Sequence, residues 1–181
     1  NLQFNLPLQN FYEKTPLCPS AISPCLGGTS ALTGIEYYLY QDTLTLVPCT
    51  DWFISTDFCC RNPNIINLSA TTNSNYASIE LNNSTSCNNS VELTAPLFIY
   101  ASQGRNNIHY PMAYDIDGDS LVFEIVNTKE NGLPISFLAG FSSANPFGPS
   151  STFSFDPNNG QFSYNIAATG VYSMGLEIKE F

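Results

Sequence analysis

The sequence is short of charged residues, and most of all of basic ones. Its 181 residues include five lysines and arginines together, fifteen aspartates and glutamates, and one histidine, which gives a formal net charge of −10. Five basic residues cannot form a stripe that follows a phosphate backbone, so nucleic acid is excluded as a partner. The same balance disfavours binding to an anionic membrane surface.

Long apolar runs are also missing. None approaches the roughly 20 residues of a membrane-spanning helix, so we expect no direct membrane insertion. The chain opens on Asn1-Leu2-Gln3, without the methionine and basic residues that begin a signal peptide. We therefore expect it to be an excised or processed segment of a longer protein.

Catalytic motifs are missing as well. The chain contains no G-x-S-x-G, P-loop or H-E-x-x-H sequence. Its single histidine, His109, has no evident acid or nucleophile beside it, which is a weak catalytic signal. We expect a protein that is not an enzyme, and no residue is assigned a catalytic role.

The chain is rich in hydrophobic residues (43%) and aromatics (13%), with asparagine, serine and threonine in place of charge. This composition is typical of secreted β proteins and unfavourable for helices. Short alternating runs separated by turn signals predict an all-β fold containing β-sandwiches. Asp156-Pro157-Asn158-Asn159-Gly160 predicts the turn of a hairpin. The expected strands are 35–40, 43–47, 52–55, 65–68, 76–81, 91–94, 121–126, 153–155, 162–166 and 172–178.

All six cysteines lie in the first half of the chain: Cys18, Cys25, Cys49, Cys59, Cys60 and Cys87. Without a C-x-x-C pair, and with one histidine, a zinc site is disfavoured, and disulfides in an oxidising compartment are the better interpretation. Adjacent residues on a strand point to opposite faces, so Cys59 and Cys60 should have different partners. Cys18 with Cys25 is a plausible local pair, which leaves Cys49 and Cys87 for the adjacent cysteines in an order left open.

The distribution of cysteines suggests two parts. Residues 1–95 would form a disulfide-rich β module or extension, and residues 96–181 a β-sandwich that includes an acidic loop. In this loop Asp115, Asp117 and Asp119 alternate around Gly118, just before the apolar run 121–126.

Like charges this close repel each other, so the acidic loop predicts a counter-ion. Calcium takes six to eight oxygen ligands and suits a short flexible acidic loop. One alternative is a solvated turn whose aspartates accept hydrogen bonds from the local backbone. We predict a structural Ca2+ site, with Glu177 and Glu180 as alternatives to Glu124 in completing the ligand shell. The expected ligands are Asp115, Asp117, Asp119 and Glu124.

Several motifs together resemble a known family. They are Cys49-x-Asp51-Trp52, Cys59-Cys60-Arg61-Asn62, the acidic loop, and a tail with Gly170-x-Tyr172 and Glu177-Ile178-Lys179-Glu180. The order is similar to that in Ig/cadherin-like modules of giant SprB-type gliding-motility adhesins, which the type 9 system secretes to the bacterial cell surface. The resemblance covers roughly residues 25–181 and implies a non-enzymatic adhesin module. The family often has a cysteine near Ala101, which this chain lacks, so no disulfide pairing is carried over.

This resemblance implies partners outside the cell: a surface or polysaccharide ligand, and neighbouring modules of the same chain. The alternatives are a carbohydrate-binding accessory module of a secreted glycan-active enzyme, or a pure structural spacer repeat. The single tryptophan, Trp52, is more often a core residue of a sandwich than a sugar-stacking platform. Asparagine triplets such as Asn67-Leu68-Ser69 match the N-glycosylation pattern, which arises by chance in a chain this rich in asparagine and serine.

Overall fold

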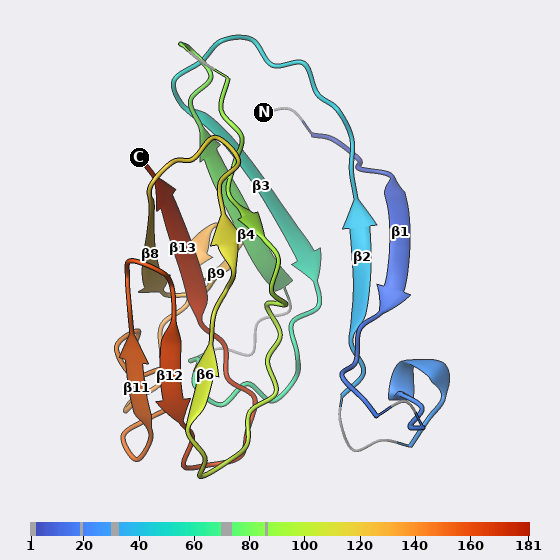
Figure 1. Cartoon of the computed structure of the whole chain (residues 1–181), viewed down its shortest axis with the longest axis vertical. Coiled ribbons are helices and arrows are strands. Elements are labelled where there is room, and N and C mark those ends of the chain that lie inside the picture. The colour runs from blue at the N-terminus through green and yellow to red at the C-terminus, as the bar shows by residue number, and fades with distance from the viewer. Residues whose placement is uncertain (1–2, 19, 30–32, 70–73, 86) are drawn as a thin grey trace. The chain divides into compact units, whose positions relative to one another are not determined.

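A computed structural model describes residues 3–18, 20–29, 33–69, 74–85 and 87–181 of the chain. These residues form an all-β protein, as predicted, whose one helix in the described part is the three-residue 3-10 turn η1 (Pro24–Leu26). The chain divides into two compact units, Asn1–Val47 and Pro48–Phe181 (Figure 1).

The first unit is built on an antiparallel ribbon of β1 (Leu8–Glu13) and β2 (Glu36–Tyr40). Aromatic pairs lie on both faces of this ribbon. Phe11 stacks on Tyr38 with ring centroids 5.8 Å apart, and Tyr12 lies 5.0 Å from Tyr37 on the other face. These cross-strand pairs stabilise a two-stranded ribbon that would otherwise be marginal in water.

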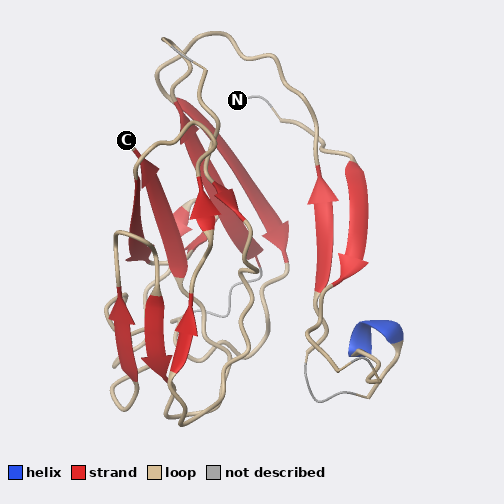
Figure 2. Ribbon diagram, in the orientation of Figure 1, coloured by secondary structure: helices blue, strands red, loops and turns tan. Residues whose placement is uncertain are grey.

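The second unit contains eleven described strands, all paired antiparallel (Figure 2). Four pairs form two-stranded sheets: β3 with β4, β5 with β7, β8 with β13, and β9 with β10. A three-stranded sheet has the order β11-β12-β6. The bounds are β3 (Trp52–Cys59), β4 (Ser74–Leu81), β5 (Glu92–Leu93), β6 (Asn107–His109), β7 (Ala113–Tyr114), β8 (Leu121–Val126), β9 (Lys129–Glu130), β10 (Leu133–Pro134), β11 (Thr152–Phe155), β12 (Phe162–Asn165) and β13 (Gly175–Glu180).

The main hydrophobic cluster lies on the inner face of β12. Phe162 and Tyr164 are buried on that face, while Ser163 and Asn165, which alternate with them, are only half-buried, as expected for a strand with one covered side. Phe147 reaches the cluster from a long loop and lies 4.9 Å from the ring of Tyr164. The burial of these large apolar side chains therefore stabilises the packing of the later strands.

Residues 61–69 tie the early part of the second unit to its end. Arg61 donates hydrogen bonds to the carbonyls of Ser74 and Lys129 and to the hydroxyl of Ser173. Asn67 has no exposed surface: its amide donates to the carbonyls of Pro146 (3.0 Å) and Ser173 (2.8 Å), and its oxygen accepts from the backbone N–H of Ser173 (3.0 Å). A buried amide whose groups are all bonded fixes the loops around it.

Most of the clearly alternating runs form the expected strands. The strand 121–126 and the hairpin of β11 and β12 are confirmed, and β2, β3 and β4 extend or match the runs at 35–40, 52–55 and 76–81. The strand expected at 43–47 is absent from these described residues, and 65–68 contributes isolated bridges alone. The structure also divides at Val47, and the β5–β7 pair spans the boundary near residue 95 that cysteine content suggested.

The cysteines correct a second expectation. Cys59 and Cys60 lie in close contact with each other, with Cα atoms 3.0 Å apart, rather than each with a different cysteine. The alternation argument does not apply because β3 ends at Cys59, so Cys60 lies outside the strand. The remaining four are free thiols, so the expected Cys18–Cys25 bridge is not formed: Cys18, Cys25, Cys49 and Cys87.

Candidate metal site

The acidic loop connects β7 to β8 and folds around the side chain of Asp115. One carboxylate oxygen of Asp115, Oδ1, accepts hydrogen bonds from the backbone N–H groups of Asp117 (2.7 Å) and Gly118 (3.0 Å), with a longer contact to that of Asp119 (3.4 Å). Gly118 has φ of 86°, a left-handed conformation that glycine adopts without steric cost. The hydrogen bonds of Oδ1 are therefore those of the predicted alternative, a turn whose aspartate accepts from the local backbone.

The second oxygen of Asp115, Oδ2, is buried and has no hydrogen-bond partner among the described residues. A buried carboxylate oxygen without a partner is costly, because the charge loses its water and gains nothing in return. A cation bound at this oxygen would satisfy it. The donor chemistry of the loop thus fits a hard metal ion.

The structure brings three acids together at this point. Asp115, Asp119 and Glu180 each offer a carboxylate oxygen, and these oxygens all lie within 4.8 Å of one another. All three residues are partly buried. Glu180 is the last residue of β13 and pairs with Leu121 of β8, which places its side chain at the start of β8 beside the loop. We refer to these residues as the acidic triad.

Asp117, the third aspartate of the loop, lies outside the acidic triad. Its carboxylate accepts hydrogen bonds from the backbone N–H of Asn89 (2.6 Å) and from the side-chain amide of Asn89 (3.0 Å). Glu180 in turn accepts from the amide of Asn88 (3.0 Å) and from the backbone N–H of Val91. Residues 88–91 are therefore held against the loop by two carboxylates.

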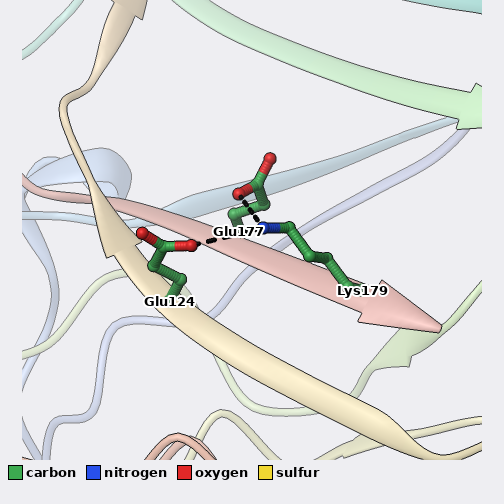
Figure 3. Close-up of polar contacts among 3 residues, drawn as sticks. All are labelled: Glu124, Glu177 and Lys179. Atoms are coloured by element: carbon green, nitrogen blue, oxygen red, sulfur yellow. Dashed lines mark hydrogen bonds and ion pairs between the residues drawn. The ribbon is translucent and has the colours of Figure 1, made fainter. Parts of the chain in front are cut away.

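Glu124 is not placed beside the loop, which corrects the predicted ligand set. Its Oε2 lies 3.3 Å from Nζ of Lys179, and the same nitrogen lies 3.3 Å from Glu177 (Figure 3). Glu124 and Glu177 are opposite each other on β8 and β13, so Lys179 separates two like charges. Hydrogen bonds to Glu124 and Glu177 raise the pKa of Lys179 above its ordinary value.

His109 stands apart from the acidic triad. It lies on β6, half-buried, with its ring centroid 5.0 Å from that of Phe162. Burial lowers the pKa of His109 below its ordinary value, because it disfavours the charged form of the ring. It packs as part of the sheet β11-β12-β6.

An open, mainly apolar cavity of about 390 Å³ lies along β8 and β11, away from the acidic triad. Its aromatic walls come from Phe123, Phe153 and Phe155, and the one acid that lines it is Glu124. Glu124, one of the four acids that the sequence predicted as metal ligands, thus borders this cavity and not the acidic triad.

Comparisons with known protein families, with curated proteins and with solved structures found no match. Among the described residues, no helix has the length and apolar character needed to cross a bilayer.

Sequence reasoning found part of the acidic triad and missed what surrounds it. The local spacing identified Asp115 and Asp119, and Glu180 was one of three alternatives for completing the shell. Local spacing does not indicate that Asn88 and Asn89 contact these acids, because they lie 28 or more positions away from them. Only the pairing of β8 with β13 and of β5 with β7 brings these segments together.

Proposed function

We propose that this chain is a non-enzymatic, sandwich-type module of a secreted cell-surface adhesin, braced by a structural Ca2+ ion at the acidic triad. The observation that carries the proposal is the buried, unpartnered Oδ2 of Asp115 within reach of Asp119 and Glu180. One ion there joins the loop before β8 to the end of β13. A brace of this kind suits a protein that must keep its shape under load outside the cell.

A row of exposed apolar side chains supports a role in attachment. Ile108, Tyr110, Met112, Tyr114 and Ile116 occupy alternate positions leading to the acidic loop, and each is between 46% and 73% exposed. Several exposed apolar side chains in one short segment are consistent with a binding site for a partner. In the proposed function this apolar row contacts the target surface or polysaccharide, and calcium holds its far end in place.

Calcium should raise the thermal stability of the chain. With the affinity usual for extracellular modules, about 10 mM calcium should raise the unfolding midpoint by about 3 to 10 °C over the value in chelator. Asp119→Asn and Glu180→Gln should abolish the rise. Glu177→Gln, a matched change on the other face of β13, should keep it. An equal midpoint with calcium and with chelator in the unaltered chain would contradict the metal site.

The exposed tyrosines favour one alternative function, that of a carbohydrate-binding accessory module. Tyr110 is 49% and Tyr114 46% exposed, and aromatic rings with polar tips bind sugars through their faces. A glycan array and an adhesion assay with coated beads separate the possibilities. Binding lost in Tyr110→Ser in both assays supports sugar recognition; adhesion without glycan binding supports a protein or mineral surface; neither activity leaves a spacer.

A further inference from the structure

The four residues before β5 are held in place by carboxylates. We refer to Asn88–Val91 as the asparagine segment. Within the described part of the chain, every hydrogen bond that these residues make ends on Asp117 or Glu180. The two middle residues are exposed and the two end residues half-buried, so burial adds little to these bonds. The position of the asparagine segment therefore depends on two carboxylates.

Glu180 belongs to both the asparagine segment's contacts and the acidic triad. Its Oε2 accepts from the side-chain amide of Asn88 (3.0 Å), and its Oε1 accepts from the backbone N–H of Val91. A further oxygen contact is to the triad, where the carboxylates of Asp115, Asp119 and Glu180 lie within 4.8 Å of one another. Hydrogen bonds from N–H groups to a carboxylate are strong, and here they offset the repulsion between like charges. The segment therefore helps to keep Glu180 in the triad.

We propose that calcium and the asparagine segment bind to these acids cooperatively, so that each holds the other in place. The inference rests on the proposed function, because it requires calcium at the acidic triad. An ion at the triad draws Glu180 toward Asp115 and Asp119, which is the position in which Glu180 accepts from the segment. The segment in turn keeps this carboxylate beside the other two. Calcium concentration then regulates how firmly the segment is held.

Asn89 makes a second link between the segment and the acidic loop. Its backbone N–H and its side-chain amide donate to Asp117, which lies between two triad acids in the sequence. Asn88 and Asn89 are thus positioning residues, which orient acids through hydrogen bonds. Residues that orient metal ligands in this way contribute about 10- to 100-fold to metal affinity. Linkage is reciprocal, so calcium strengthens the hold on the segment by the same factor that the segment adds to calcium affinity.

Calorimetric titration of the whole chain with calcium chloride measures this coupling. Asn88→Ala should weaken calcium binding by about tenfold, because Glu180 loses one of its two donors. Ser90→Ala is the matched control. Ser90 is exposed and lies in the same segment, and its side chain makes no hydrogen bond to any residue that the structure describes. The control should change the calcium affinity by less than about twofold.

Hydrogen exchange of the unaltered chain supplies a second measurement, which needs no substitution. The backbone amides of Asn89 and Val91 should exchange at least about fivefold more slowly in calcium than in chelator. The amide of Asn158 is the control, since it also donates to a carboxylate, that of Asp156 (2.9 Å), in the exposed turn between β11 and β12. Its exchange should not respond to calcium.

The outcomes separate this inference from the proposed function. Calcium binding that Asn88→Ala and Ser90→Ala leave equally strong overturns the cooperative link, while the calcium brace stands. Binding that leaves the exchange of Asn89 and Val91 unchanged has the same meaning. An unaltered chain that binds no calcium overturns both. Weaker binding in Asn88→Ala, together with slower exchange of the two amides in calcium, supports the link.

Discussion

Asn67 illustrates how one polar side chain organises the second unit. It is fully buried, and its amide group bonds to Pro146 and to both backbone groups of Ser173. In the sequence the same residue begins an N-glycosylation triplet, whereas in the structure its nitrogen is inside the protein. A pattern of three residues cannot show burial, because burial depends on loops 79 and 106 positions away.

Replacing Asn67 with alanine should destabilise the second unit strongly. The change removes the hydrogen bonds of Asn67 to the buried carbonyl of Pro146 and to the partly buried carbonyl and N–H of Ser173, which we expect to cost about 3 kcal/mol of unfolding free energy. Urea unfolding monitored by circular dichroism measures the change. Asn106→Ala is the control, since Asn106 is exposed; equal losses in the two variants would show that burial of Asn67 contributes nothing.

At the scale of the element, β13 serves two surfaces at once. Leu176 and Ile178 pair with Ile125 and Phe123 on the inner face, where both partners are buried. Glu177 and Lys179 lie on the outer face, where Lys179 contacts Glu124 as well (Figure 3). The alternation of residue types along 172–178 predicted a half-buried strand, because period-two patterns of this kind are read directly from a sequence. The strand forms three residues later than predicted, at Gly175–Glu180.

Other elements could not be read in this way. β1 was not predicted, because Leu8–Glu13 mixes apolar and polar residues and all but its last residue are exposed. It becomes a strand through pairing with β2, more than 20 positions later. The acidic triad is likewise only partly predictable from the sequence. Local spacing predicts Asp115 and Asp119, whereas Glu180 joins them through the pairing of β8 with β13.

Lys179→Gln should lower the unfolding midpoint in a way that depends on salt. The variant leaves Glu124 and Glu177 facing each other across two strands, and like charges in opposed positions destabilise a sheet. The three side chains are exposed, so salt screens the repulsion. Thermal unfolding at low salt and at about 1 M salt should show a deficit that narrows with salt. Arg105→Gln, also exposed, should show no such trend; a deficit independent of salt would point to lost packing.

At the scale of the whole molecule, the division at Val47 separates the aromatic ribbon from the strands that carry the acidic triad. Each unit has its own strand pairs, and the main hydrophobic cluster lies entirely in the second. The distribution of cysteines predicted the boundary between the two parts near residue 95, because it carries no information about which strands pair.

Residues 48–181 should therefore fold without the first 47. A compact unit with its own core is expected to fold alone. The shortened chain should unfold in one cooperative transition, with a midpoint within about 3 °C of the corresponding transition in the whole chain. Circular dichroism during heating measures this. Loss of the cooperative transition would mean that the ribbon of β1 and β2 is needed for the core to form.

The contacts of residues 61–69 also set the order of events during folding. Arg61 bonds to Ser173 across 112 positions, and Ile65 bridges to Val171. Loops this long close late, because their ends must meet before any contact stabilises them. During synthesis, residues 61–69 therefore cannot complete these contacts until residue 173 has left the ribosome. We expect the second unit to reach its final packing only after its last strands have been made.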